Sequence, residues 1–311
     1  MNHYDIIGDI HGHAEELKAL LFDMGYNRRG GGYRHTDRKV MFVGDFVDRG
    51  PAIGEVVDIA RAMVESGDAL AVMGNHEYNA ISFHTAVPGR SSKYFRDHSV
   101  KNCGQHQQTL FQLSCGELND AIEWFKTLPV AIEVGGIRVA HASWQTRDID
   151  CINQALSTEG KFTPEFLAMA EDAGSDLNTA IENVLKGPEL PLPRGYSIQD
   201  KGGHKRNSVR IKWYEDGSGR TYSQHHLGSD KVPNVSIDPS DLATVETYPP
   251  DAVLECPHFL VHRYESRDWG IGFALGCFRS GSVATGAEAA QCEANTAGGM
   301  PPSPLCGRRW L

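Results

Sequence analysis

Hydrophobic positions in the first 85 residues follow a strand–helix rhythm. Short apolar runs predict buried strands at residues 4–8, 39–43 and 69–73. Apolar side chains three and four positions apart predict helices between these strands, at 17–24 and 56–63, each followed by a glycine. Strands of four or five apolar residues that alternate with helices are typical of parallel sheets buried on both faces, so the pattern indicates an α/β fold.

The middle of the chain is more polar. Residues 84–108 are rich in histidine and polar side chains, which favours an exposed loop or a helical cap. A helix is expected around 118–126. Two glycines between the apolar runs 130–134 and 137–140 predict a β-hairpin.

The following segment contains clear helix signals and one long irregular stretch. Thr163, followed by proline, predicts the start of one helix, and Ser175 predicts the cap of a second helix that ends at Gly187. Residues 188–250 are rich in proline, glycine and charge around a single strand-like run at 208–214. This composition indicates an insertion or a long surface excursion.

Residues 270–311 differ from the rest of the chain. They contain eight glycines, no lysine and no aspartate, and they follow no helical or strand period. We therefore expect a folded domain over 1–269 and an atypical, poorly ordered tail over 270–311. One hypothesis for the change in composition is a translation-frame change near residues 251–256.

Composition excludes several classes of protein. The 311 residues are 40% hydrophobic and 23% charged, with a formal net charge of −10. No run approaches the roughly 20 apolar residues of a membrane span, and no signal-peptide pattern is visible, so we expect a cytoplasmic protein without a membrane partner. The net acidity argues against dedicated nucleic-acid binding. The seven cysteines lack paired spacing, which favours free thiols.

Polar residues gather directly after each of the three early strands. Because the carboxyl ends of parallel strands meet at one edge of a sheet, these side chains are expected to lie together. Carboxylate, imidazole and amide groups in combination suit manganese, iron or zinc. The clusters are Asp9 with His11, Asp45 with Asp48 and Arg49, and Asn75 with His76 and Glu77.

The clusters lie in Gly8-Asp9-Ile10-His11-Gly12, Gly44-Asp45-Phe46-Val47-Asp48-Arg49-Gly50 and Gly74-Asn75-His76-Glu77, and a fourth segment is Val139-Ala140-His141-Ala142. These segments resemble the motifs of the calcineurin-like metallophosphoesterases, in the branch with serine/threonine protein phosphatases and symmetrical dinucleoside tetraphosphatases. The resemblance implies a layered β-sheet sandwich flanked by helices, with a metal site at the C-terminal ends of strands. It assigns residues 1–269 to one such domain, with excursions at 84–108 and 188–250.

The resemblance also implies two divalent metal ions, with manganese or iron expected and zinc as an alternative. Two metals about 3.5–4 Å apart can clamp the attacking and leaving oxygens of a displacement, and water bound to a metal ionises near neutral pH. The implied ligands are Asp9 and His11 for one ion, Asp45 as a bridge, and Asn75 and His141 for the other, with a last histidine from the final third of the chain.

The family pattern usually supplies this last histidine after a strand and a glycine. The best candidate is His262, which follows the apolar run 259–261, with valine in place of the glycine. An ordinary core or surface histidine is the alternative, and His258 is a rival ligand. Gly203-His204 carries the dipeptide but lies in a polar run, which favours a solvated loop or a contact with substrate.

The same resemblance implies the catalytic groups. His76 is the expected general acid, because the free pKa of histidine, about 6.5, lies near working pH. Asp48 is expected to fix the tautomer of His76, and Arg49 to bind phosphoryl oxygens through its fork of donors. A surface ion pair is the alternative for Asp48 and Arg49. Glu77 is expected to favour the dipole of a helix N-terminus rather than to act in catalysis.

The expected function is metal-dependent hydrolysis of phosphomonoesters, of the protein-phosphatase type, with a phosphoprotein or nucleotide as substrate. Hydrolysis of dinucleoside tetraphosphates is the first alternative, because the early motifs serve both reactions. A non-catalytic module that binds phosphorylated ligands is the second, and it would follow from an incomplete second metal site. Substrate specificity is expected to come from residues 84–108 and 188–250.

Overall fold

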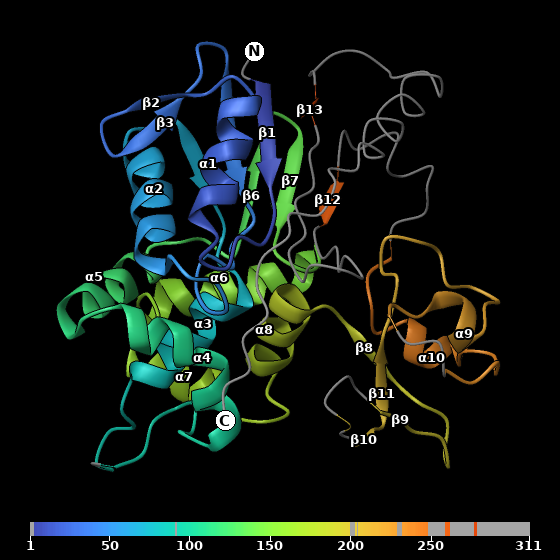
Figure 1. Cartoon of the computed structure of the whole chain (residues 1–311). Coiled ribbons are helices and arrows are strands. Elements are labelled where there is room, and N and C mark those ends of the chain that lie inside the picture. The colour runs from blue at the N-terminus through green and yellow to red at the C-terminus, as the bar shows by residue number, and fades with distance from the viewer. Residues whose placement is uncertain are drawn as a thin grey trace, which may run out of the picture. The chain divides into compact units, whose positions relative to one another are not determined.

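Two β-sheets pack face to face in the computed structural model (Figure 1). The first contains, in spatial order, β13 (Cys277–Phe278), β1 (His3–Ile7), β4 (Arg38–Phe42) and β5 (Ala69–Ala71). The second contains β12 (Phe259–Val261), β7 (Ile137–Ala140) and β6 (Ala131–Val134). The structure describes residues 3–90, 92–199, 203, 205–228, 232–247, 259–261 and 277–278. Strands β1, β4 and β5 are parallel, and the sandwich confirms the expected fold.

Strands β1 and β4 of the first sheet are buried on both faces. Tyr4 and Ile6 of β1 and Met41 of β4 belong to an apolar cluster that they share with the β6–β7 hairpin. Val40 and Phe42 alternate with Met41 and belong instead to the main core, which they share with the helices. This arrangement explains why the strands appear in the sequence as continuous apolar runs. Val134 pairs with Ile137 across two glycines, which confirms the predicted hairpin.

Helices cover the main core. The helices before β6 are α1 (Ala14–Asp23), α2 (Ile53–Glu65), α3 (Asn75–His84), α4 (Val100–Gln112) and α5 (Cys115–Phe125). Those after β7 are α6 (Thr146–Glu159), α7 (Pro164–Ala170) and α8 (Asp176–Lys186). Thr163 and Ser175 cap α7 and α8, as predicted, because their side-chain oxygens accept backbone N–H groups. The sequence pattern does not predict α6, in which only Ile149 and Ile152 are buried.

The polar segment 84–108 is partly helical. It begins at the end of α3, contains no further helix in its described residues before Val100, and continues into α4, so both the loop and the helical form of the prediction are observed in part. Its polar composition does not mean that every side chain is exposed, because His106 and, just beyond the segment, Thr109 are buried. Both residues contact the loop after β4. The segment therefore contributes directly to the edge of the sheet where the predicted site residues lie.

The segment predicted as an excursion, 188–250, carries more core than its composition indicates. Leu190, Val209 and Trp213 belong to the main apolar cluster, and Trp213 Nε1 donates to the carbonyl of Ala142 at 3.1 Å. Only the first part of the predicted strand at 208–214 is extended.

Several small elements complete the described structure. Those of the segment 188–250 are β8 (Glu189–Pro191), β9 (Ile198–Gln199), β10 (Lys205–Arg206), β11 (Ser208–Arg210), α9 (Tyr222–His225) and α10 (Pro239–Leu242). Earlier in the chain, a hairpin pairs β2 (Asn27–Arg29) with β3 (Gly32–Arg34).

Several expectations fall outside the described residues. Apart from the two residues of β13, the predicted tail at 270–311 is not described, and neither are the domain boundary at 269 and the segment 251–256 of the frame-change hypothesis. Cys103, Cys115 and Cys151 are free thiols. Within the described part of the chain, no helix has the length and apolar character that a bilayer crossing requires.

Two glycines allow the loops after β4 and β5 to touch. Gly44 has a φ of +88°, in the left-handed region that favours glycine. A β-carbon on Gly44 would lie 2.3 Å from the backbone nitrogen of Gly74, and one on Gly74 would lie 2.3 Å from Asp45 Oδ1. A side chain at either position would therefore push the two loops apart.

Replacing Gly44 with alanine should destabilise the fold much more than the same change at Gly67. Both glycines have a positive φ, but no atom lies within 4 Å of a β-carbon placed on Gly67. Gly67→Ala should cost about 1–2 kcal/mol for the left-handed backbone. Gly44→Ala should add about 1–3 kcal/mol for overpacking. Urea unfolding of the two variants measures the difference, and equal losses would show that the contact with Gly74 is unimportant.

Candidate metal and phosphate site

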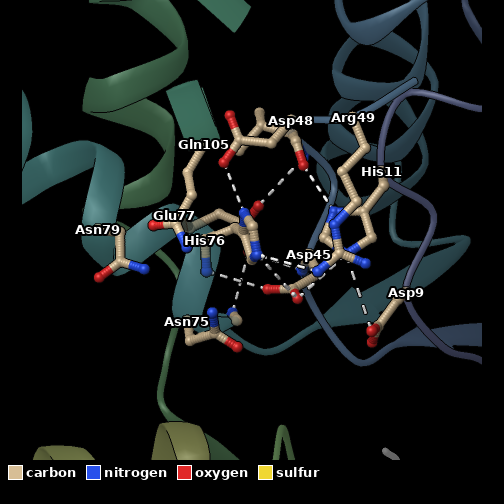
Figure 2. Close-up of polar contacts among 12 residues, drawn as sticks. Asp9, His11, Asp45, Asp48, Arg49, Asn75, His76, Glu77, Asn79 and Gln105 are labelled. Atoms are coloured by element: carbon tan, nitrogen blue, oxygen red, sulfur yellow. Dashed lines mark hydrogen bonds and ion pairs between the residues drawn. The ribbon is translucent and has the colours of Figure 1, made fainter. Parts of the chain in front are cut away.

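The predicted site residues converge at the C-terminal edge of the first sheet (Figure 2). The loop after β1, the loop after β4 and the first turn of α3 all reach this edge. The second sheet adds one residue, His141, directly after β7. The structure therefore brings together Asp9 and His11, Asp45, Asp48 and Arg49, Asn75 and His76, and His141.

Asp45 lies at the centre of this group and is buried. Its Oδ2 lies 3.5 Å from His11 Nε2, and its Oδ1 lies 3.6 Å from His141 Nε2. Burial opposes the negative charge, but the neighbouring histidines, His141 first, hold the pKa of Asp45 well below its usual value. Asp45 is therefore an ionised carboxylate that presents one oxygen to each of two histidines.

Two sets of side chains could each hold a metal ion, and both contain Asp45. One is formed by His11, Asp45 and His76, and the other by Asp9, Asp45 and His141. In each set, the potential ligand atoms lie within 4.8 Å of one another. The pairs that the sequence motifs imply are also close. His11 Nε2 lies 3.8 Å from Asp9 Oδ2, and His141 Nε2 lies 3.0 Å from Asn75 Oδ1.

The tautomers of two histidines fit metal binding. His11 Nδ1 lies 2.7 Å from the carbonyl of Val47, and His141 Nδ1 lies 2.7 Å from the carbonyl of Val43. Because a carbonyl only accepts, each Nδ1 must donate, and the lone pair of each neutral ring is on Nε2. Burial lowers the pKa of His11 to about 4, and its Nε2 has no hydrogen-bond partner among the described residues. This donor set fits a divalent cation.

Glu77 has a larger role than the expected helix dipole. Its buried carboxylate accepts the backbone N–H groups of Asp45 at 2.7 Å and Phe46 at 2.8 Å, and also that of Gly74 at 3.0 Å. Burial and the charge of Asp45 raise the pKa of Glu77 to about 7. The bond to Gly74 caps α3, as the position of Glu77 in the first helical turn indicates. The bonds to the loop after β4 are a contact that the sequence does not reveal.

The loops of the site are held in an unusual backbone conformation. Among the described residues, five other than glycine have a positive φ, and four of them are His11, Asp45, Asp48 and Arg49. Left-handed geometry costs about 1–2 kcal/mol for such residues. Concentrated strain of this kind is typical of functional sites, where surrounding contacts hold it in place.

His76 and Asp48 form a close pair. His76 Nδ1 lies 2.5 Å from Asp48 Oδ2, so Nε2 is the ring atom that remains to exchange a proton. Burial opposes the charge of His76, but the carboxylates of Asp45 and Asp48 outweigh it and raise the pKa of His76. Burial likewise opposes ionisation of Asp48, but hydrogen bonds from His106 and His76 hold its pKa well below its usual value. The pair therefore favours a protonated imidazole beside an ionised carboxylate.

Arg49 approaches the same imidazole. Its NH2 group lies 3.5 Å from His76 Nε2. No carboxylate of a described residue forms an ion pair with Arg49, and Asp48 is buried against the histidines instead. The surface ion pair considered for Asp48 and Arg49 is therefore not the observed arrangement.

Helix α4 supplies two residues that the sequence motifs do not identify. His106 Nδ1 lies 2.7 Å from Asp48 Oδ1, and Thr109 Oγ1 donates to the same oxygen at 2.6 Å. Thr109 Oγ1 also accepts the backbone N–H of Asp48 at 3.0 Å. Residues three apart share a face of a helix, which brings His106 and Thr109 to one carboxylate. The only sequence signal is this spacing within an otherwise polar helix.

A second histidine extends the contacts of His106. His84 Nε2 lies 3.1 Å from His106 Nε2. Burial and the neighbouring histidines lower the pKa of His84 to about 4, so it is neutral at physiological pH. A continuous series of hydrogen bonds therefore runs from His84 through His106 and Asp48 to His76.

The last predicted ligand cannot be placed. His262, its rival His258 and His204 all lie outside the described residues. Strand β12 is parallel to β7 and ends at Val261, which pairs with Ala140, the residue before His141. Ligation by His262 therefore remains a prediction.

Comparisons with known proteins agree with this architecture. Residues 3–230 match the family model for the calcineurin-like phosphoesterases. The chain is 32% identical over 142 residues to bis(5'-nucleosyl)-tetraphosphatase PrpE [asymmetrical] of Oceanobacillus iheyensis, which covers 44% of this chain and 55% of the relative. It is 32% identical over 156 residues to the PrpE protein of Bacillus subtilis, with 47% and 59% covered. The chain thus spans little more than half the length of these two relatives.

Solved structures show weaker likenesses. A protein serine/threonine phosphatase of Saccharomyces cerevisiae is 18% identical, with a TM-score of 0.33 over 46% of this chain and 39% of that chain. A cold-active protein-tyrosine phosphatase of a psychrophilic Shewanella is 14% identical, with a TM-score of 0.38 over 57% of this chain and 56% of that chain.

Replacing Thr109 with valine should destabilise the protein by about 1–3 kcal/mol, because the buried N–H of Asp48 loses its acceptor. Valine has nearly the same shape, so the change removes the hydroxyl without opening a cavity. Thr158→Val is the matched control. Thr158 is exposed and its hydroxyl bonds only within its own helix, so the loss should stay within about 0.5 kcal/mol. Similar unfolding midpoints in urea for both variants would contradict the importance of the Thr109 bonds.

Proposed function

The chain belongs to the calcineurin-like phosphoesterase family, and from this premise we propose that it hydrolyses the phosphoanhydride bonds of dinucleoside tetraphosphates. The observation that carries the choice of substrate is the likeness to relatives named as bis(5'-nucleosyl)-tetraphosphatases. The sequence motifs led us to expect phosphomonoester hydrolysis of the protein-phosphatase type, with tetraphosphate hydrolysis as the alternative. The likeness to these relatives favours the alternative. The names of these relatives carry the designation asymmetrical.

The proposed metal ligands are Asp9, His11, Asp45, Asn75 and His141, with His262 as a further candidate. Two observations support this ligand set. Asp45 lies between His11 and His141, and the Nε2 lone pair of each histidine faces it. Divalent cations bound there would stabilise phosphoryl charge and acidify a water molecule near neutral pH. Manganese, iron and zinc all suit such a mixture of oxygen and nitrogen ligands.

The chain's own residues would bind the phosphate and move the proton. Arg49, which lies beside His76 Nε2, would bind phosphoryl oxygens and offset their developing charge. His76 would donate its Nε2 proton to the oxygen that leaves. Asp48 would hold the ring by its Nδ1 and stabilise the protonated form. His106 and Thr109 would act only through Asp48, as positioning residues.

A panel of substrates tests this proposal. With manganese present, the purified chain should show its highest kcat/KM on diadenosine tetraphosphate, compared with a phosphopeptide and p-nitrophenyl phosphate. Chromatography of the products separates asymmetrical cleavage, which gives ATP and AMP, from symmetrical cleavage, which gives two ADP. Preference for the phosphopeptide would favour a protein phosphatase. Ligand binding without turnover of any substrate would favour a binding module.

Replacing Asp45 with asparagine should reduce turnover in that panel by about 10- to 100-fold on every substrate. Asp45 is the carboxylate that both sets of candidate ligands share, so its loss weakens both. The matched control is Asp37→Asn, because Asp37 is exposed and lies outside the site. It should leave kcat/KM unchanged within a factor of about two. Unchanged manganese-dependent activity in Asp45→Asn would contradict the proposed ligand set.

Replacing His76 with asparagine should reduce turnover to a degree that depends on the leaving group. An alkyl phosphate such as phosphoserine needs a proton on its leaving oxygen, so kcat should fall by about 10²–10⁴-fold. p-Nitrophenolate and a nucleotide phosphate are much weaker bases and need less protonation, so their losses should be smaller. Steady-state kinetics on the three substrates measures the ratio. Equal losses on all three would show that His76 is not the acid.

A further inference from the structure

A cleft beside His76 contains an arginine that the catalytic proposal does not use. Arg96 lines this small cleft with Asp48, His76 and Asn79, and the apolar ring of Phe83 also lines it. In Figure 2, Asn79 and Gln105 lie on the side of His76 away from Asp9. The cleft therefore continues from the proposed acid in the direction away from the candidate metal ligands.

The guanidinium group of Arg96 contacts neutral oxygens rather than a carboxylate. Its NH1 donates to Asn79 Oδ1 at 2.9 Å, and its NH2 donates to Gln105 Oε1 at 2.8 Å. No carboxylate oxygen of a described residue lies within 4.0 Å of a nitrogen of this guanidinium group, the distance that defines an ion pair. Arg38, which is also partly buried, pairs with Asp5 at 3.1 Å. Arg96 thus differs from a structural arginine of the same domain.

Burying the charged guanidinium group of Arg96 without a carboxylate partner has a free-energy cost, and a bound anion would offset it. Arg96 is partly buried, and burial lowers the pKa of its guanidinium group despite more distant carboxylates. Taking a charge out of water without a counter-ion is unfavourable. The cost falls when an anion enters the cleft. Phosphate is well matched, because the planar fork of arginine binds two of its oxygens at once.

The residues around Arg96 are held by the same elements as the site. Asn79 lies one helical turn after Asn75 on α3, so both side chains occupy one face of that helix. Gln105 directly precedes His106, which contacts Asp48. The oxygens of Asn79 and Gln105 accept from Arg96, so the NH₂ groups of both amides remain as donors. Beyond the charged pair of His76 and Asp48, the cleft therefore combines the cation of Arg96 with two amide donors.

We infer that Arg96, Asn79 and Gln105 form a subsite for a second phosphate group of the substrate, on the leaving-group side of the bond that is cut. The assignment of that phosphate to a dinucleoside tetraphosphate rests on the proposed function. A tetraphosphate bridge carries several negative charges, and Arg49, which lies beside His76 Nε2, would contact only the phosphoryl group next to that ring. Arg96, a second cation beyond His76, supplies a partner for the next phosphate along the tetraphosphate bridge.

Replacing Arg96 with glutamine tests the subsite. Arg96→Gln should raise KM for diadenosine tetraphosphate by about 10- to 100-fold, the range expected for a lost charge-assisted hydrogen bond. The loss on p-nitrophenyl phosphate should be much smaller than the loss on diadenosine tetraphosphate, because p-nitrophenyl phosphate has a single phosphate. Arg90→Gln, in the exposed part of the same connection, is the matched control and should change activity on neither substrate. Equal losses on both substrates would show that Arg96 is structural and would overturn the subsite.

Inhibition by inorganic tripolyphosphate separates this inference from the proposed function. Measured against p-nitrophenyl phosphate, tripolyphosphate should inhibit the unmodified protein more strongly than orthophosphate does. Arg96→Gln should reduce that difference by about tenfold or more. The result does not depend on hydrolysis of a dinucleotide, so it supports the subsite even if diadenosine tetraphosphate is a poor substrate. An unchanged preference for tripolyphosphate in Arg96→Gln would overturn it.

A second variant protects the test against misfolding. Arg96→Lys keeps the charge but loses the fork, so its KM for diadenosine tetraphosphate should lie between those of the unmodified protein and Arg96→Gln. If Arg96→Gln unfolds at a lower urea concentration, the comparison with Arg96→Lys still reports the phosphate contact. A KM for Arg96→Lys as high as that of Arg96→Gln, with unchanged stability, would contradict a charge contact with the substrate.

Discussion

A carboxylate buried away from water needs partners, and Glu77 has them in the backbone N–H groups of Gly74, Asp45 and Phe46. These bonds join the first turn of α3 to the loop after β4. That loop contains three of the four site residues with a left-handed backbone, so its shape is not the one an unrestrained chain would adopt. The position of Asp45 between two histidines, and the approach of Asp48 to His76, both depend on that shape.

Two histidines in contact show how this scaffold assigns different chemistry to the same side chain. The ring centroids of His11 and His76 lie 4.6 Å apart, yet the pKa values of the two rings shift in opposite directions. His11 is buried and donates to a carbonyl, so its neutral form is favoured, and a neutral ring is what a metal ion binds. His76 lies between Asp45 and Asp48, so its charged form is favoured, and a charged ring can give up a proton. Neighbouring charges and hydrogen bonds therefore distinguish the proposed metal ligand, His11, from the proposed acid, His76.

Sequence reasoning succeeds where a local rule determines position. Asp9, Asp45 and Asn75 follow buried parallel strands, so their convergence could be predicted from the rule that such strands end at one edge. The contacts of His106 and Thr109 with Asp48 depend on how α4 packs, which no local pattern determines. Arg96 is one charged residue in a polar segment, and only the packed structure shows that no described carboxylate pairs with it. The short strands β8, β9 and β10 are not predicted for a related reason, since they contain few apolar residues.

Helix α4 links the proposed phosphate subsite to the orientation of the proposed acid. Its His106 and Thr109 fix Asp48, and Asp48 in turn fixes the Nδ1 side of His76. The adjacent Gln105 holds the guanidinium group of Arg96, which lines the cleft beyond His76. A displacement of α4 would therefore disturb the acid and the cleft together, because neighbouring residues of one rigid helix cannot move independently. A phosphate bound at Arg96 would, for the same reason, stabilise the position of α4 in which Asp48 orients His76.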